Sequence, residues 1–269
     1  MRFAGSYKIV VLLVSWFFAL SAWAAPDAAA FKALFDRATV AAYPNADTVT
    51  LYDEEKTVYQ RDGLYVEYLE FCSKVLTEAG RKNLRQLSFP YSADYDTLAV
   101  ESAAVISPDG RRTELDVAKH AKVSISTGGM SSNIFNPERK VLSFSVPDLE
   151  VGGAVCLKLR YTGIRTPFPG KFSSNFLLQD DVPVLRASVT VDAPEELPLK
   201  SIAIKDKVGD TVKFLGEKRR NGRIVYAWIA SDVPQLIPEP NMPRQSGVAQ
   251  RLLISTARDW QEISRWYIR

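Results

Sequence analysis

Hydrophobic and polar residues alternate with a period of two along most of the chain, from Thr48 to Ser255. Such alternation indicates β-strands with one buried face, and Val, Tyr and Thr, which favour strands, are frequent in it. Turn residues interrupt the pattern at Pro108-Asp109-Gly110, at Gly152-Gly153 and at Asn221-Gly222, the last a strong two-residue hairpin signal. The pattern predicts about ten strands. They cover residues 48–60, 64–76, 97–107, 111–115, 140–146, 154–163, 184–193, 211–220, 223–231 and 249–256.

A helical period replaces the alternation at both ends of this region. Near the N-terminus, the apolar positions that share one helix face are Phe31, Leu34, Phe35 and Ala38, and Pro44 ends the pattern. We therefore predict a helix over residues 25–44 and an all-β, antiparallel, sandwich-like domain over residues 45–257. A short terminal helix over residues 258–269 follows it.

Two stretches inside the β region do not read as strands. Residues 116–140 are rich in Gly and Ser, and residues 166–183 carry several Pro and Phe. We expect the first to form a long loop and the second to form a crossover between strands. Long loops on a β scaffold often carry the binding residues.

The terminal helix has a wide apolar face. Its members fall at i, i+3, i+6 and i+7: Trp260, Ile263, Trp266 and Tyr267. Asp259 or Thr256 can cap its start. An isolated helix of this length is marginal in water, so we predict that these four side chains form a contact surface for a partner. The alternative is a frayed C-terminus.

The first 24 residues have the pattern of a signal peptide. Arg2 and Lys8 precede the apolar run Ile9–Leu20, and Ala22-Trp23-Ala24 fits a cleavage site. The apolar run is short for a full membrane span, so we expect cleavage rather than an anchor. The mature chain is then exported, to the periplasm in a Gram-negative source, with no membrane span.

Composition and charge indicate a folded globular protein and exclude some classes of partner. The chain of 269 residues is 46% apolar and 24% charged, as in folded globular proteins. Its net charge is +3, and removal of Arg2 and Lys8 with the signal leaves +3 − 2 = +1. This near-neutral balance argues against a nucleic-acid partner.

The chain has two cysteines, Cys72 and Cys156. In the predicted strands each shares a face with charged residues, Cys72 with Glu70 and Lys74, which places both thiols toward the polar side. An exported protein meets an oxidising compartment, so a Cys72–Cys156 disulfide is possible. Two free thiols are the alternative.

The residues offer no supported catalytic, cofactor or metal site. His120, beside Lys119 and Lys122, is expected to be a solvated surface residue, and no local signature supports a pairing of His120 with Cys156. One His and two separated Cys do not match zinc-site spacing. The acidic pairs that could offer oxygen ligands to calcium are expected to be solvated instead. They are Asp94 with Asp96, and Asp180 with Asp181.

The order of several short segments is nevertheless distinctive. They are "YPNADTVTLYDE" (43–54), "LTEAGRKNL" (76–84), "SPDGRRTEL" (107–115), "FSVPDLEVGGAVCLKLRY" (144–161), "LQDDVPVLRASVTVDAP" (178–194), "YAWIASDVPQLIPEPNMP" (226–243) and "STARDWQEISRWY" (255–267). In this order they resemble the exported bacterial domain of unknown function that precedes a transglutaminase-like domain, which is related to papain-like cysteine peptidases.

The resemblance implies a non-catalytic accessory module. In that family the terminal helix leads into the transglutaminase-like core, whose catalytic Cys, His and Asp lie beyond it, so none of them maps onto this chain. The expected partner is a protein or peptide, with a transglutaminase-like domain in trans as one option. Two alternatives remain: the N-terminal part of a cysteine peptidase or amide-transferring enzyme, or a glycan- or peptide-binding module.

Overall fold

The computed structural model describes residues 26–128, 135–206, 208–209, 211–243 and 245–268. The predicted signal peptide, residues 1–24, lies outside this part. The strands are β1 Thr48–Tyr59, β2 Tyr65–Val75, β3 Gln86–Ser92, β4 Asp96–Ile106, β5 Arg112–Glu114, β6 Ala121–Ile125, β7 Arg139–Ser145, β8 Ala154–Gly163, β9 Ser173–Leu177, β10 Val184–Pro194, β11 Ser201–Lys205, β12 Val212–Arg220, β13 Arg223–Val233 and β14 Arg251–Ser255. The helices are α1 Ala28–Arg37, α2 Glu78–Leu84, α3 Val117–His120, α4 Gln245–Val248 and α5 Trp260–Tyr267.

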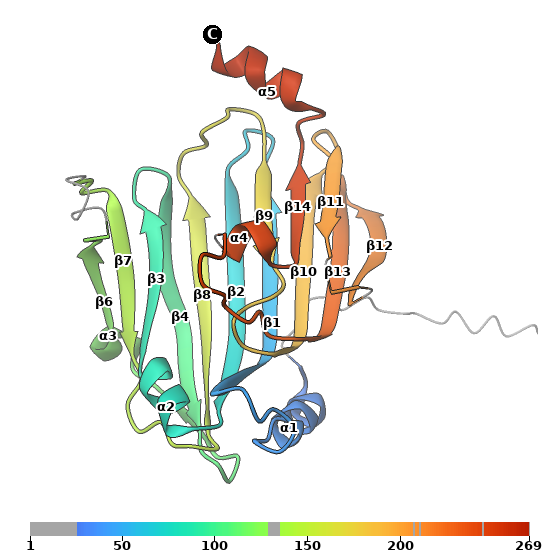
Figure 1. Cartoon of the computed structure of the whole chain (residues 1–269). Coiled ribbons are helices and arrows are strands. Elements are labelled where there is room, and N and C mark those ends of the chain that lie inside the picture. Colours follow the sequence, from blue (N-terminus) through green and yellow to red (C-terminus); the bar gives the residue numbers. More distant parts are fainter. Residues whose placement is uncertain (1–25, 129–134, 207, 210, 244, 269) are drawn as a thin grey trace, which may run out of the picture.

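The strands form one large sheet and two small ones (Figure 1). The large sheet has the order β12-β13-β10-β1-β2-β8-β4-β5, and the small sheets are β11-β14-β9 and β3-β7-β6. Every described pairing is antiparallel except that of β1 with β10, which is parallel. The all-β prediction is thus confirmed, with short helices near both ends.

Each small sheet packs its own hydrophobic core against the large sheet. One core joins β10 and β13 to the β11-β14-β9 sheet, and its largest buried side chains include Trp228, Tyr59 and Phe176. The other joins β4 and β8 to the β3-β7-β6 sheet around Phe144 and Leu157. The two small sheets therefore lie over one face of the large sheet, which we call the inner face, and pack over different strands of it.

Helix α1 forms a third core with the large sheet. Phe35 and Ala38 pack there with Leu51, while the Nζ of Lys74 donates a 2.7 Å hydrogen bond to the carbonyl of Phe35. The helix begins after Asp27, whose Oδ1 accepts from the N–H of Ala30. It ends at Arg37 rather than continuing to residue 44, because turns closed by Thr39 follow. None of the described helices is long and apolar enough to cross a membrane.

Both stretches predicted as loops contain regular structure. Residues 116–140 include α3 and β6, and β6 pairs with β7. Residues 166–183 include β9, which pairs with β14 and buries Phe176. The loop predictions were wrong here because these strands are short and are fixed by partners distant in the sequence. Residues 129–134 lie outside the described part.

Candidate functional site

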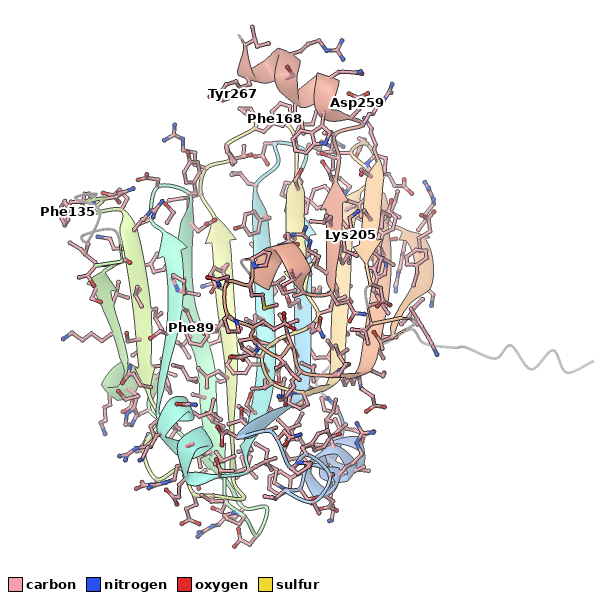
Figure 2. The ribbon with its side chains drawn as sticks, in the orientation of Figure 1. Phe89, Phe135, Phe168, Lys205, Asp259 and Tyr267 are labelled. Carbon is pink, nitrogen blue, oxygen red and sulfur yellow. A yellow bond between two sulfur atoms is a disulfide. The ribbon has the colours of Figure 1, made fainter. Side chains whose placement is uncertain are left out.

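Helix α5 projects beyond the end of β14 (Figures 1 and 2). The segment that leads into it is bonded to the backbone of Phe172. The Oγ1 of Thr256 accepts a 2.9 Å hydrogen bond from the N–H of Phe172 and also donates a 3.2 Å bond to its carbonyl. The N–H of Thr256 donates to the same carbonyl at 2.9 Å. Since Thr256 is fully buried, these bonds fix where the chain leaves the sheet.

The start of α5 is capped by Asp259, one of the two residues proposed for that role. The N–H of Glu262 donates a 2.9 Å bond to Oδ1 of Asp259, and Oε2 of Glu262 accepts a 2.9 Å bond from the N–H of Arg258. This arrangement resembles a capping box, with the Glu262 side chain bonded one residue before the cap. Lys171 also forms an ion pair with Glu262. The Arg258 N–H and then Lys171 lower the pKa of Glu262 to about 2.

The apolar face of α5 is largely open to solvent. Trp260 and Tyr267 are each 82% exposed, Ile263 is half-buried, and the side chain of Trp266 lies outside the described part. Beside the helix is an open groove of about 590 Å³ over the β11-β14-β9 sheet. It is lined by Ser173, Ser174, Asn175, Ser201, Ala203, Leu253, Ile254, Ser255, Ala257, Arg258, Asp259, Trp260 and Ile263. The structure thus brings Trp260 and Ile263 together at one apolar groove.

Replacing Glu262 by alanine tests how α5 is held. The change removes the acceptor of the Arg258 N–H and the partner of Lys171, so amide hydrogen exchange in residues 260–267 should rise by at least about threefold. Glu217→Ala, at an exposed acid on β12, is the matched control and should leave α5 unchanged. Equal exchange in both variants would show that the Glu262 side chain does not hold the helix.

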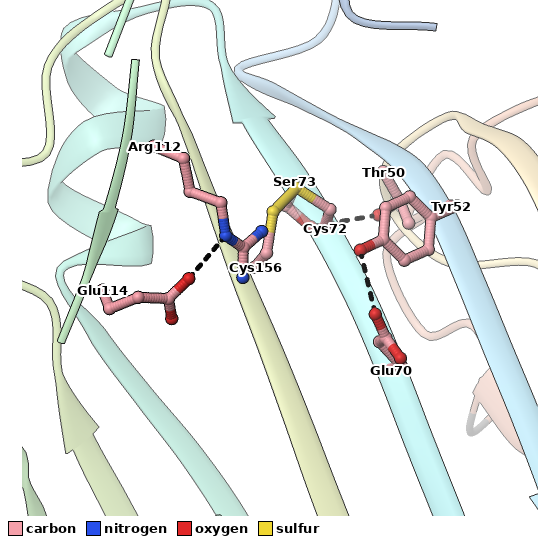
Figure 3. The surroundings of a disulfide bond; sticks show 8 residues. All are labelled: Thr50, Tyr52, Glu70, Cys72, Ser73, Arg112, Glu114 and Cys156. Atoms are coloured by element: carbon pink, nitrogen blue, oxygen red, sulfur yellow. Dashed lines mark hydrogen bonds and ion pairs between the residues drawn. A yellow bond between two sulfur atoms is a disulfide. The ribbon is translucent and has the colours of Figure 1, made fainter. Parts of the chain in front are cut away.

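The two cysteines lie opposite each other on neighbouring strands and are joined by a disulfide (Figure 3). Cys72 is fully buried and Cys156 is 4% exposed, so the expectation that both thiols lie toward a polar side was wrong. The face does carry Glu70 and Lys74, but α1 covers its end and encloses both sulfurs in the third core. Strand parity alone does not show such a cover.

Sequence reasoning missed a group of carboxyls on the inner face of the large sheet. Glu55 and Glu67 are half-buried there, and Oε2 of Glu67 accepts a 3.3 Å bond from Thr57. Burial raises the pKa of Glu67 to about 7, and burial with Asp53 and Glu67 nearby raises that of Glu55 well above its usual value. The sequence does contain a signal for their burial, because Asp53, Glu55 and Thr57 share a strand parity with the core residue Tyr59.

The remaining candidates do not assemble into a catalytic or metal site. His120 is half-buried at the end of α3, with its ring 6.1 Å from that of Phe144, and Cys156 has no free thiol to pair with it. Asp96 accepts a 2.7 Å hydrogen bond from Tyr65. Among the described residues, no three His, Cys, Asp or Glu side chains are placed to hold a metal ion.

Two solved structures match much of this chain, to different degrees. A protein from Parabacteroides distasonis, described as "a putative protease", is 18% identical over 78% of this chain, with a TM-score of 0.66. This chain spans 40% of its length. An M1 zinc metallopeptidase from Deinococcus radiodurans is 13% identical over 77% of this chain and 42% of its own, but its TM-score of 0.39 is too low to support an argument.

No curated protein matches the chain. A family model described as a domain of unknown function with a solved structure, DUF3857, matches residues 61–237, which cover β2 to β13. Since this match extends over more than half of the sequence, the chain belongs to the DUF3857 family.

Proposed function

We propose that the chain is a non-catalytic, exported binding module and that the α5 groove binds a protein partner, a transglutaminase-like domain. The observation that carries the proposal is the highly exposed Trp260 on a helix anchored to a buried core. The resemblance of the segment order to domains that precede transglutaminase-like domains supports the choice of partner. The similarity to a longer protein described as "a putative protease" supports it at the level of fold.

The groove offers enough apolar surface for such contact. Full burial of a tryptophan removes about 150–250 Å² from water, which corresponds to about 4–6 kcal/mol before ordering costs. Arg258 and Asp259 lie at the same groove and supply polar groups around the apolar part. An apolar centre with a polar surround is the usual composition of a protein interface.

The non-catalytic part of the proposal rests on side-chain chemistry. His120 lies beside an aromatic ring, and both cysteines are in a disulfide. No nucleophile–base pair is therefore supported by the described residues. The disulfide suits an oxidising compartment, which agrees with export through the predicted signal peptide.

Replacing Trp260 by alanine is expected to weaken partner binding by about tenfold or more, because a large exposed aromatic side chain is a typical interface anchor. The test measures binding of residues 25–269 to transglutaminase-like domains of the same genome, each expressed separately. Phe135→Ala, another exposed aromatic distant from α5 in Figure 2, is the matched control. Undiminished binding by the Trp260 variant, or no binding to any such domain, would refute the proposed partner site.

One observation favours a second candidate. Because this chain spans 40% of the P. distasonis protein, it could correspond to the N-terminal part of a larger enzyme. In that case the same groove would contact a catalytic domain of the same polypeptide. Sequencing the gene across codon 269 distinguishes the two, since an uninterrupted frame into a transglutaminase-like core supports the second.

A further inference from the structure

A second pocket is lined in part by α2. In Figure 1, α2 and α5 lie at opposite ends of the sheets. The volume of the pocket is about 500 Å³. Its lining comes from β1, β2, α2 and the segment between β9 and β10: Thr48, Thr50, Asp53, Phe71, Ser73, Asn83, Leu84, Asp180, Asp181 and Val182. Hydroxyl, amide and carboxyl groups therefore share the pocket with the ring of Phe71.

A β-bulge creates this combination of residues. Along a regular strand, Thr50 and Asp53 would point to opposite faces. The register of β1 against β2 shifts between Thr50 and Tyr52, so that Thr50 lies opposite Ser73 and Asp53 lies opposite Phe71. Since Ser73 and Phe71 are two residues apart and share a face, Thr50 and Asp53 are brought to the same face as well.

Asp53 lines the pocket and carries an unsatisfied acceptor that is buried beneath the pocket wall. Its Oδ1 is buried and has no hydrogen-bond partner among the described residues. Buried carboxyl oxygens are normally hydrogen-bonded, and an orphaned one costs about 1–3 kcal/mol. Asp180 and Asp181 are exposed, so they form the rim while Asp53 lies deeper. The pocket thus has three carboxyls, one of which has an oxygen with an open hydrogen-bond position.

The chemistry of the lining restricts the ligand. No three acidic, His or Cys side chains of the described residues are placed to hold one metal ion, which does not favour a metal ion as the ligand. An ammonium or guanidinium group carries several N–H donors, which can bond to more than one of these oxygens. The face of Phe71 can contribute a cation–π contact, and Thr50 and Ser73, whose oxygens lie 3.4 Å apart, can accept further bonds.

We propose that this pocket binds an organic cation, an alkylammonium or guanidinium group, with Asp53 as the deep acceptor and Asp180 and Asp181 at the rim. The cation can belong to a free amine or to a lysine or arginine side chain of a peptide. The site is separate from the α5 groove, so it does not depend on the partner proposed there.

The charge environment supports a cationic ligand. Burial, followed by Asp180, Glu54 and Glu67, raises the pKa of Asp53 to about 7. Glu55 adds a further carboxyl on the same strand face, Asp181 adds one at the rim, and α2 contributes only the uncharged Asn83 and Leu84 to the lining. A cation binds the ionised form, so it must displace a proton from Asp53 below pH 7. Affinity should therefore rise by about tenfold from pH 6 to pH 8.

Isothermal titration of the mature chain with three probes tests the proposal. The probes are Nα-acetyl-lysine amide, Nα-acetyl-arginine amide and n-butylamine, and Nα-acetyl-norleucine amide is the uncharged match. We expect binding of at least one cationic probe and none of the norleucine amide. If the lysine or arginine amide binds more tightly than n-butylamine, the natural cation is a peptide side chain. If n-butylamine binds more tightly, the natural cation is a free amine.

Asp53→Asn keeps the shape of the side chain but removes its negative charge, and it should reduce affinity by about tenfold or more. It should also fold well, because it removes a charge that burial disfavours. Glu217→Gln on β12 is the matched control and should bind as the native chain does. Unchanged binding by Asp53→Asn, equal binding of norleucine amide, no binding of any cationic probe at millimolar concentration, or preferential binding of calcium would each overturn the proposal.

Discussion

Replacing Cys72 and Cys156 together by alanine is expected to lower the free energy of unfolding by about 3–5 kcal/mol. The disulfide closes a long segment, since its two ends are 84 residues apart in the sequence. A cross-link over such a distance restricts the unfolded chain and stabilises the folded state by about 4.6 kcal/mol in the chain-entropy account. The loss of two buried sulfurs beneath α1 adds a packing cost.

Urea unfolding of the mature chain, followed by tryptophan fluorescence, measures this effect. Native protein unfolded in the presence of a thiol reductant is the internal comparison and should approach the double variant. Thr162→Ala, at another paired position of β8 against β2, controls for mutation of this strand pair. If the double variant and the native protein unfold at the same urea concentration, the cysteines contribute nothing to stability.

The cysteines also show what strand parity can and cannot predict. Parity correctly placed Cys72 with Glu70 and Lys74 on one face of β2. It did not show that α1, about 40 residues earlier in the chain, folds over the end of that face. Whether a position is buried depends on which element covers it, and an amphipathic helix does not specify its docking site by its own pattern.

Most strands of the large sheet could be predicted because each shows a long alternating pattern. β1, β2, β8, β10 and β13 have ten to twelve residues each, and all five fall on predicted segments. β6 and β9 have five residues each and were missed. A five-residue strand carries little periodicity, and its neighbours β7 and β14 supply the specificity through tertiary pairing.

The two candidate sites also differ in how far a local sequence pattern predicts them. The apolar face of α5 follows from helical spacing, and its capping by Asp259 follows from a short local motif. The pocket around Asp53 depends on the bulge between Thr50 and Tyr52, which reverses the parity of one strand within two residues. A bulge leaves no reliable mark in a single sequence, so Asp53 and Thr50 could not be placed together from the pattern.

Phe172 links the buried core to the α5 groove. Its side chain is 4% exposed, and its ring stacks on that of Tyr59 with the ring centres 4.3 Å apart. Its backbone N–H and carbonyl both bond to Thr256, four residues before α5. Packing of the Phe172 ring therefore helps to fix Thr256 and the segment that leads into α5.

Phe172→Ala is expected to lower the free energy of unfolding by about 3–5 kcal/mol, because it leaves a cavity against Tyr59. It should also raise hydrogen exchange in α5, since the Phe172 backbone loses its fixed position beside Thr256. Phe135→Ala is the matched control: Phe135 is 60% exposed, so its loss should change stability by no more than about 0.5 kcal/mol and leave α5 unaffected. Equal stability of the two variants would contradict the core placement of Phe172. Loss of stability without faster exchange in α5 would instead show that the helix is held independently of this ring.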